Sequence, residues 1–446
     1  MPTVHRLTAL ALARAMLAGP PDAAGLAARL HVCLGTRDSA WCRPLADRCA
    51  RLPGEHWRRL TARTLATLIE RDAGYLRAWS TEDTRPNVRR YILRTATRMQ
   101  PPPLGLDRCH VPDWPHTAAL ARWLDVPDAG MWRLTRPAAW QRRAPLGEQH
   151  YRYHLLAKRR GGWRLLEEPQ PHLMALQRRL LDDLLDRIPP HQAACGYARE
   201  RSVLDHARAH RGQAVVLKFD LQDFFASVRA SRVHALFATL RYPAPVAREL
   251  AALCTTATPE PVLRRMHEDG QLSWPQLQRL RDPHLPQGAP TSPALANLCA
   301  FRFDLRLDGL AHALGARYTR YADDIVLSGD RALRDASPRI EAWVARIAIE
   351  EGFALNHRKT RCLVAAQRQT VCSIVVNRHP NLPRAEFDRL KAILHRCATQ
   401  GPAAQNREAR ADWREHLRGR VAWAEQVNPQ KAQRLRRLFE QIDWSR

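Results

Sequence analysis

The stretch Ala316-Arg-Tyr-Thr-Arg-Tyr-Ala-Asp-Asp-Ile-Val-Leu327 decides the fold of this chain. Strand-like residues flank Asp323 and Asp324, so the pattern predicts a β-hairpin with two adjacent acids at its turn. A further acid, Asp220, ends an apolar strand predicted over residues 214–220. A carboxylate that closes a buried strand is costly unless a cation or a hydrogen-bond donor meets it. The three acids therefore predict a site for a pair of divalent metal ions, and the alternative is that Asp323 and Asp324 form an ordinary polar turn.

The elements around this hairpin predict a mixed α+β fold with an all-α N-terminal region. Residues 1–100 read as successive helices, and a proline-rich linker follows to about residue 115. Residues 150–166 predict a second hairpin with a basic turn. One more strand is predicted over residues 373–377, and helices over residues 117–124, 130–136, 172–186, 231–240, 244–254, 291–313 and 338–351 and from 384 onward.

Composition narrows the class of protein. The 446-residue chain carries 71 basic and 44 acidic residues, a net charge of +27. This excess favours a polyanionic partner and argues against a neutral metabolic enzyme. Apolar residues make up 45% of the chain, enough for a sizeable core. The ten cysteines are scattered and form no C-x-x-C pair, which predicts a cytoplasmic location. The sequence has no apolar run long enough to predict a membrane span.

Three motifs carry a resemblance to a known family. Phe219-Asp-Leu-Gln-Asp-Phe-Phe225, Leu285-Pro-Gln-Gly-Ala-Pro-Thr-Ser-Pro293 and Tyr321-Ala-Asp-Asp324 resemble, in this order, the palm motifs of reverse transcriptases. The segments 352–360 and 371–377 are similar to the next two motifs of the family. The resemblance extends from about residue 114 to about residue 400. It implies a right-hand polymerase, with a helical extension over residues 1–113, fingers and an antiparallel palm over 114–383, and a helical thumb over 384–446.

Within the family, the chain is most similar to the bacterial retron type, especially the myxobacterial-like members with a helical N-terminal extension. Two markers of that group differ here. His206 replaces an asparagine, and Val371-Cys372-Ser373 stands where the group carries Val-Thr-Gly. These differences bear on the retron assignment and leave the polymerase assignment untouched.

The resemblance implies a two-metal site. Asp220 and Asp323 would ligate two Mg²⁺ ions, for which Mn²⁺ can substitute, with help from the carbonyl of Leu221 and with Asp324 in support. Carboxylate oxygens suit Mg²⁺. Two metal ions about 4 Å apart can activate a primer hydroxyl and stabilise the leaving oxygen. The primer hydroxyl would attack the α-phosphate of a dNTP, and pyrophosphate would leave.

Three residues are implied to contact the nucleotide. Phe225 matches the position of a steric gate, where a ring under the sugar leaves no room for a 2′-hydroxyl; an ordinary core phenylalanine is the alternative. Gln287 would touch the incoming nucleotide or the template base. Gly288 would allow the backbone to approach either of them closely.

Basic side chains are implied to handle the phosphates. Lys158 and Arg164 flank the basic hairpin turn and resemble residues of the fingers that hold the triphosphate, with a solvated basic face as the alternative. Lys359, one of only five lysines, matches a position proposed to protonate pyrophosphate. An ammonium can act as an acid where a guanidinium scarcely can. A phosphate contact without proton transfer is the alternative for Lys359.

Other residues are candidates for RNA contact. His206 and His210 lie four residues apart, on one face if their segment is helical, where they would contact RNA, pack against the neighbouring structure or, least expected, bind a metal. Arg389 and Arg396 belong to a basic helical region that resembles a thumb tracking an RNA–DNA duplex through its backbone and shape.

The sequence therefore predicts an RNA-directed DNA polymerase of retron type. It would copy part of a structured non-coding RNA, which serves as template and primer, into single-stranded DNA in an RNA–DNA hybrid product, and would act in antiphage defence with an effector protein. The alternatives are a group II intron-like or other defence-associated reverse transcriptase, and an RNA-binding scaffold without catalysis. No recognisable endonuclease or RNase H segment follows the predicted thumb, which disfavours a full intron maturase.

Overall fold

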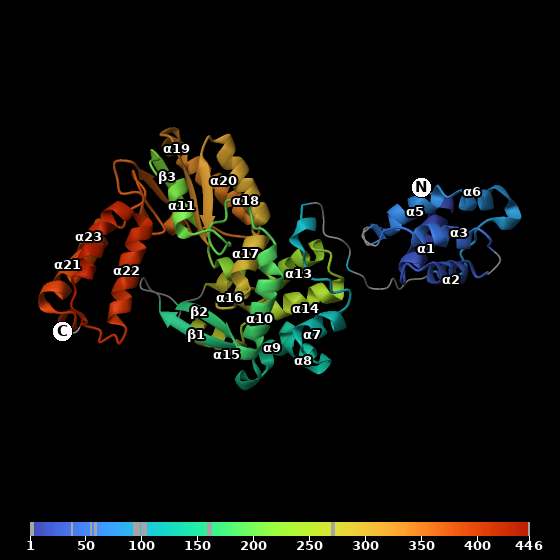
Figure 1. Ribbon diagram of the computed structural model, residues 1–446, viewed down its shortest axis with the longest axis horizontal. Coiled ribbons are helices and arrows are strands. Elements are labelled where there is room, and N and C mark those ends of the chain that lie inside the picture. The colour runs from blue at the N-terminus through green and yellow to red at the C-terminus, as the bar shows by residue number, and fades with distance from the viewer. Residues whose placement is uncertain are drawn as a thin grey trace. The chain divides into compact units, whose positions relative to one another are not determined.

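The computed structural model describes residues 4–36, 39–53, 56–57, 60–91, 99, 105–157, 163–268 and 273–444 (Figure 1). The chain divides into two compact units, residues 1–135 with 234–252, and residues 136–233 with 253–446. The functional boundaries expected after residues 113 and 383 are not boundaries of these units, and they stay a prediction.

The first unit begins with a helical bundle. Its helices are α1 (Val4–Leu17), α2 (Ala23–Leu34), α3 (Cys42–Ala50), α5 (Ala62–Glu70) and α6 (Ala73–Ser80). Polar caps start several of them: Asp22 accepts a hydrogen bond from the Gly25 N–H at the start of α2, and Thr61 forms a capping box at α5. Fully buried leucines such as Leu26, Leu30 and Leu65 form the core of the bundle. Hydrophobic burial between short amphipathic helices therefore holds this region together.

The remainder of the first unit is also helical. It holds the short 3₁₀ segments η1 (Glu82–Thr84) and η2 (Asp107–Cys109), the helices α7 (Thr117–Leu124) and α8 (Asp128–Leu134), the end of α13 (Ala230–Thr239) and nearly all of α14 (Ala244–Cys254). Trp114 stacks on Tyr242 with ring centroids 5.3 Å apart, and the Tyr242 hydroxyl donates to the Pro112 carbonyl. This contact connects the segment before α7 to the segment between α13 and α14.

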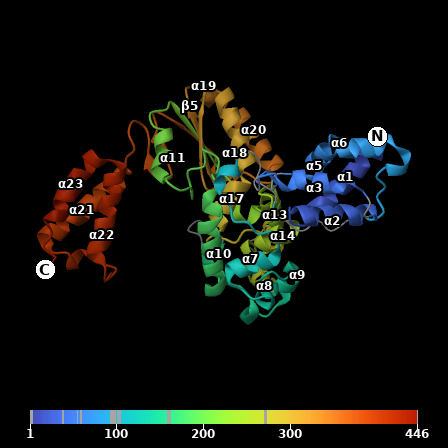
Figure 2. The same ribbon diagram turned by 45° about the vertical axis from the view of Figure 1, so that its right-hand side comes forward.

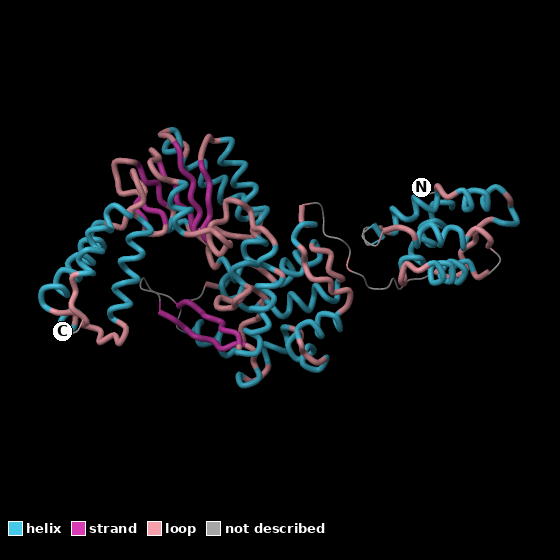
Figure 3. Tube along the Cα trace, in the orientation of Figure 1, coloured by secondary structure: helices cyan, strands magenta, loops and turns pink. Residues whose placement is uncertain are grey.

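The second unit contains all the strands among the described residues (Figure 3). Its main sheet has four antiparallel strands in the order β4-β5-β3-β6, with β3 at Val215–Asp220, β4 at Arg317–Tyr321, β5 at Asp324–Gly329 and β6 at Arg361–Val364. Two hairpins accompany it, β1 (Tyr151–Ala157) with β2 (Trp163–Pro169), and β7 (Thr370–Val371) with β8 (Ile374–Val375).

Alternate residues of the main sheet face two different layers. Val216 and Val326 share a core cluster with helix α11 (Val203–Ala209) and with the β7–β8 hairpin. On β4, Tyr318 and Arg320 instead contact Asp304 of helix α18 (Phe301–Ala313), on the opposite face. The sheet is therefore covered on both faces, which buries its strands and brings Asp220 and Asp324 to their ends.

The other elements of the second unit are helical. They are α9 (Ala138–Arg143), α10 (Pro171–Asp183), α12 (Phe224–Ser227), α15 (Glu260–Glu268), α16 (Trp274–Arg281), α17 (Ser292–Cys299), α19 (Ala332–Asp335) and α20 (Ser337–Glu350), with 3₁₀ segments η3 (Leu146–Glu148), η4 (Leu185–Arg187), η5 (His357–Lys359) and η6 (Ala403–Gln405). The C-terminal three, α21 (Arg384–Gln400), α22 (Trp413–Val427) and α23 (Pro429–Glu440), pack around Leu394, Leu417 and Leu435 (Figure 2).

Most expected elements are present, with one error. The hairpins predicted over residues 150–166 and 316–327 are confirmed by their strand pairing. The single helix predicted over residues 291–313 is wrong, because the chain forms α17 and α18 with Ala300 between them. The described helices include none whose length and apolar character would let it cross a membrane.

Candidate functional site

The β-ladder brings the three predicted carboxylates together. Asp220, the last residue of β3, pairs directly with Asp324, the first residue of β5. Directly opposite residues of an antiparallel pair lie with their Cα atoms about 4.5–5.5 Å apart. The N–H of Leu221 donates to the carbonyl of Asp323 at 3.0 Å, which joins the end of β3 to the turn. Residues about a hundred positions apart in the sequence thus form one acidic cluster.

The turn that carries Asp323 has an unusual backbone. Tyr321 pairs with Asp324, so Ala322 and Asp323 form a two-residue hairpin loop between β4 and β5. Ala322 has φ 55°, in the left-handed region that side chains with a Cβ rarely adopt. A residue held there costs about 1–3 kcal/mol and persists only where its surroundings enforce it. The residues around Ala322 therefore help to determine the position of the Asp323 side chain.

The acidic cluster carries more negative charge than its environment compensates. Burial, and then the charges of Asp220 and Asp324, raise the pKa of Asp323 to about 6. Burial also raises the pKa of Asp220, although a hydrogen bond from Lys359 acts in the opposite direction. Carboxyl groups whose pKa is raised by burial and by one another are a favourable place for a cation.

Lys359 supplies a positive charge at this point. Its Nζ donates to Asp220 Oδ2 at 2.7 Å, and the backbone N–H of Asn356 donates to the Asp220 carbonyl. Burial alone would lower the pKa of Lys359, but the hydrogen bond and charge of Asp220 outweigh burial and raise it. Lys359 is therefore a protonated ammonium at neutral pH. The structure brings it to Asp220, and its role as a proton donor stays a prediction.

The donor set suits a hard divalent cation, although it is not arranged as a closed cage. Carboxylate oxygens are the ligands that Mg²⁺ prefers. The pKa values of Asp220 and Asp323 are raised, so a bound cation would stabilise their ionised forms. Among the described residues, no group of three or more His, Cys, Asp or Glu side chains is already arranged to hold a metal ion. Because the Lys359 ammonium contacts Asp220 Oδ2, a cation bound there would have to displace it. Asp220, Asp323 and Asp324 therefore fit as donors that require a local rearrangement.

Phe225 lies beside the acidic cluster in a group of aromatic rings. It follows Asp220 by one short turn, in helix α12, and is half-buried. Its ring centroid lies 6.3 Å from that of Tyr197, which in turn lies 6.1 Å from that of Tyr321. The ring of Phe225 is thus not enclosed in the core, and its role as a steric gate stays a prediction.

Gln287 and Gly288 pack against the hairpin strand β2. The carbonyl of Gln287 accepts a hydrogen bond from the N–H of Glu167 at 2.9 Å. A Cβ at Gly288 would come within 3.0 Å of the Glu167 carbonyl oxygen, and its φ of 139° lies where side chains are strained. The close approach that requires this glycine in the structure is to the backbone of β2, and an approach of Gln287 and Gly288 to the nucleotide or template stays a prediction.

Of the two predicted triphosphate-binding residues, Lys158 lies outside the described residues. Arg164 is exposed on β2, opposite Leu156 in the hairpin register. Its charge acts on the Tyr197 hydroxyl, where it opposes the rise in pKa that burial causes. Arg164 is therefore within electrostatic reach of the aromatic group beside Phe225, and its contact with triphosphate stays a prediction.

His206 and His210 lie inside the protein. Both are fully buried between α11 and the sheet. His206 Nδ1 and His210 Nε2 hydrogen-bond to the Thr319 hydroxyl, and His210 Nδ1 to that of Ser328. Burial lowers the pKa of His206 to about 3 and that of His210 well below its usual value, so both rings are neutral. Buried neutral rings favour the packing alternative over the RNA contact expected for both residues.

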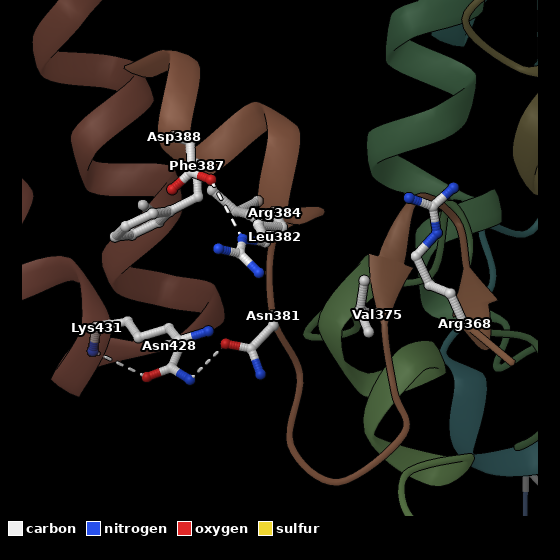
Figure 4. Close-up of a pocket in the computed structure, with 10 residues that line it drawn as sticks. Arg368, Val375, Asn381, Leu382, Arg384, Phe387, Asp388, Asn428 and Lys431 are labelled. Atoms are coloured by element: carbon white, nitrogen blue, oxygen red, sulfur yellow. Dashed lines mark hydrogen bonds and ion pairs between the residues drawn. The ribbon is translucent and has the colours of Figure 1, made fainter. Parts of the chain in front are cut away.

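Arg389 and Arg396 are exposed, seven residues apart on α21, and so lie on one face of that helix. A pocket of about 460 Å³ lies between the base of these C-terminal helices and strand β8, and is called here the thumb-root pocket (Figure 4). Its lining includes Arg368, Arg384 and Lys431, with Phe387 on one wall. Asp388 also lines the pocket and pairs with Arg384 at 3.5 Å, and the remaining positive charge suits a phosphate-bearing ligand.

Three residues near the acidic cluster were not predicted from the sequence. Tyr197 is half-exposed and contacts Phe225. The thiol of Cys372 donates to Asp324 Oδ2 at 3.5 Å, from a two-residue turn in which Cys372 and Ser373 both have positive φ. Arg320 is fully buried behind the turn. Arg320 is one of two arginines on β4, and the sequence alone does not distinguish the buried Arg320 from the exposed Arg317.

Comparison with known proteins gives one family. A profile described as reverse transcriptase (RNA-dependent DNA polymerase) matches residues 156–388, just over half of the chain. Two proteins of Myxococcus xanthus are similar: the retron Mx65 reverse transcriptase, 41% identical over 65% of this chain and 64% of that protein, and the retron Mx162 reverse transcriptase, 35% identical over 63% and 59%. The matched segment thus spans less than two thirds of either protein. These similarities confirm the resemblance to retron reverse transcriptases found in the sequence.

Solved structures are more distant. A telomerase from Candida tropicalis in complex with a TWJ fragment of telomeric RNA aligns with 62% of this chain and 54% of its own, at 11% identity and a TM-score of 0.33. A TM-score this low does not indicate a shared overall fold.

Proposed function

We propose that this chain, which belongs to the reverse transcriptase (RNA-dependent DNA polymerase) family, is an RNA-directed DNA polymerase of retron type. It copies part of a structured partner RNA into single-stranded DNA from dNTPs, and the product is an RNA–DNA hybrid. The observation that carries the proposal is the convergence of Asp220, Asp323 and Asp324 at the ends of β3 and β5.

The proposed chemistry uses these carboxylates as metal ligands. Two Mg²⁺ ions, or Mn²⁺ in their place, would activate the primer hydroxyl and stabilise the leaving oxygen when bound there. Asp220 and Asp323 hold them, with Asp324 and the Leu221 carbonyl in support. Lys359 is protonated and lies at Asp220, so it is placed to give a proton to pyrophosphate; phosphate contact alone is the alternative.

Substrate selection is assigned to the rings and cations around the acidic cluster. Phe225 packs under the sugar and excludes a 2′-hydroxyl, and Gln287 touches the incoming nucleotide or the template base. Arg164 and Lys158 contact the triphosphate. The support for this arrangement is that Phe225 and Tyr197 form an incompletely buried aromatic group beside Asp323.

The RNA and the hybrid product are assigned to the basic C-terminal region, which we propose to act as a thumb. A net charge of +27 and the exposed cations of the thumb-root pocket support a phosphate backbone as ligand. Arg389 and Arg396 would follow an A-form-like duplex by shape rather than by base sequence. By its resemblance to retron reverse transcriptases, the enzyme acts in antiphage defence together with an effector protein.

A polymerase assay tests the proposal. Purified protein with Mg²⁺, an RNA template with a DNA primer, and dNTPs should make DNA, and Asp323→Asn should reduce the rate by about a thousand-fold, since it removes a carboxylate charge that would hold the metal ions. Asp335→Asn, an exposed acid on α19, is the matched control. Full activity in the Asp323→Asn variant would favour the scaffold alternative.

Sequencing of the nucleic acid that co-purifies separates the retron assignment from other reverse transcriptases. The retron reading expects one structured RNA joined to DNA, often through a branch at a 2′-hydroxyl. Recovery of bulk cellular RNA alone would contradict it and leave a group II intron-like or other defence-associated enzyme.

In the polymerase assay, Phe225→Ala should relax the preference for dNTPs over rNTPs, and unchanged discrimination would remove the gate assignment.

A further inference from the structure

A buried ion pair lies directly behind the turn that carries Asp323. Arg320 on β4 and Asp304 on α18 are both fully buried. The guanidinium binds the carboxylate with two bonds, Nε to Oδ1 at 2.7 Å and Nη2 to Oδ2 at 2.6 Å. The Tyr318 hydroxyl also donates to Asp304 Oδ1 at 2.6 Å. These bonds leave the guanidinium in one fixed orientation.

The remaining side of the guanidinium faces the turn. Nη1 of Arg320 donates to the Ala322 carbonyl at 2.9 Å and to Asn297 Oδ1 at 3.0 Å. Ala322 is the residue with φ 55° and immediately precedes Asp323. Arg320 therefore holds the carbonyl of the one strained peptide in the loop that presents a proposed metal ligand.

The chain at Gly196 makes a second contact with the turn. A Cβ at Gly196 would come within 2.8 Å of the Ala322 backbone nitrogen, so the chain at residue 196 lies directly against the turn. The Asn297 side-chain amide donates to the Gly196 carbonyl at 2.7 Å and accepts from Arg320. Gly196 and Arg320 thus contact the two peptide groups on either side of the Ala322 Cα and are joined to each other through Asn297.

Stability alone does not account for this arrangement. A buried ion pair can often be replaced by apolar residues with little loss of stability, because desolvation offsets the attraction between the charges. An apolar pair, however, could not bind the Ala322 carbonyl. The bond to the turn is the property that only the charged, forked side chain provides.

We propose that Arg320 is a positioning residue, which keeps Ala322 in the left-handed conformation and thereby sets the position of the Asp323 carboxylate. This inference rests on the proposed function, because it assigns Arg320 to the same metal site. Supporting groups behind metal ligands typically change metal affinity by about 10–100-fold when they are removed. A misplacement of about 1 Å can reduce a rate about a hundred-fold.

Arg320→Lys is the main test, since it keeps the charge beside Asp304 but cannot bind Asp304, Asn297 and Ala322 together. We expect kcat to fall at least about ten-fold, with the KM for dNTP changed less than about two-fold. The dissociation constant for Mn²⁺, measured by electron paramagnetic resonance, should rise at least about ten-fold. Arg317→Lys is the matched control on the same strand, where the exposed arginine binds the Ala209 carbonyl.

Ala322→Gly provides a readout that a merely structural role for Arg320 would not move. Glycine adopts positive φ without a steric penalty, so it reduces the need for an external hold. In the Arg320→Lys background, Ala322→Gly should therefore recover part of the lost kcat and Mn²⁺ affinity. Purely additive effects of the two substitutions would overturn the proposal, as would wild-type kcat and Mn²⁺ affinity in a folded Arg320→Lys protein.

Two further outcomes can be told apart, namely an Arg320→Lys variant that does not fold and a wild-type protein that makes no DNA. If Arg320→Lys does not fold, Asn297→Ala removes one bond to the guanidinium and leaves the pair with Asp304; it should lower kcat and Mn²⁺ affinity in parallel, and no change in either overturns the proposal. If the wild-type protein makes no DNA, the proposed polymerase function fails, and the Mn²⁺ measurements then decide the positioning role by themselves.

Discussion

The main sheet and the N-terminal bundle are both well packed, but their interiors differ in kind. In the second unit, fully buried side chains include the Arg320–Asp304 pair at the main sheet and His284 beside strand β2. In the bundle, Thr8 and Asp72 are the buried polar residues among those described, and Asp72 serves as a helix cap paired with Arg48. One interior holds charges away from water, and the other is almost entirely leucine, alanine and cysteine.

The difference shows that apolar side chains are enough to pack an interior, whereas buried charges serve to hold a group in a fixed position. Burying a charge costs free energy that its pairing seldom returns in full. Buried charges are therefore expected where a chain must hold a group in one place, and the sheet beside Asp323 has them. The core of the bundle is held mainly by the hydrophobic effect, and its buried acid, Asp72, serves as a helix cap.

The largest expected effect tests the buried charges themselves. Glu167 on β2 binds His284 Nε2 at 2.9 Å and accepts from the Thr258 hydroxyl at 2.8 Å, and its side chain is almost fully buried. Glu167→Ala breaks this buried pair and leaves His284 Nε2 and the Thr258 hydroxyl without their partner, so the free energy of unfolding in urea should fall by about 3–5 kcal/mol. Replacing Glu167 and His284 together by leucine should recover most of that loss. A single-variant effect below about 1 kcal/mol, the value of a surface pair, would remove the distinction between the two interiors.

The matching test in the bundle is Leu30→Ala. Leu30 is fully buried in α2, and removal of a buried leucine side chain costs about 2–5 kcal/mol. We expect this loss in the unfolding of the bundle, with the rate of DNA synthesis on a simple template and primer unchanged. Leu307→Ala, the same substitution at a fully buried position of α18, should cost a similar free energy and also lower the rate, because α18 carries Asp304. Equal rates in both variants would contradict the comparison.

The local part of the site was predictable from the sequence. Two acids in a hairpin turn and one at the end of an apolar strand lie together because strand ends meet in a sheet, and strand and turn patterns are local properties. The spacing of His206 and His210 likewise predicted that they share a helix face. The spacing could not show which residues pack on that face. They are Thr319 and Ser328, which lie on strands more than a hundred residues away in the sequence.

The parts that were missed are long-range contacts. The bond from Lys359 to Asp220 joins residues 139 positions apart, and the packing of Gly288 on Glu167 joins the motif over residues 285–293 to strand β2. Periodicity over a helix or strand carries no information about such pairs. The break between α17 and α18 was missed for a related reason, since Ala300 is itself a good helix former and nothing in the local sequence predicts the break.

A smaller effect concerns the pH dependence of the metal-free protein. The folded pKa of Asp323, about 6, lies above its ordinary value of 3.8, so its contribution to stability is complete below the ordinary value and is lost as pH rises through about 6. Asp323→Asn should therefore unfold at the same temperature as wild type near pH 4 and at a higher temperature near pH 7. Mg²⁺ should close that gap at pH 7. A constant difference at every pH, or the same trend in Asp335→Asn, would contradict this account of the acidic cluster.

The smallest expected effect concerns exposed charges on the surface, which act independently of one another, unlike the buried and hydrogen-bonded pairs. Arg396 is exposed on α21, so Arg396→Gln should leave the free energy of unfolding within about 0.5 kcal/mol of wild type. If it contacts one phosphate, the slope of log affinity for an RNA–DNA duplex against log salt should become shallower by about 1. Lys431→Gln at the thumb-root pocket should have a similar effect, and Arg334→Gln, exposed on α19, is the control. A change of slope in the control as large as in the other two would mean that net charge acts on the duplex as a whole, with no particular role for the proposed thumb.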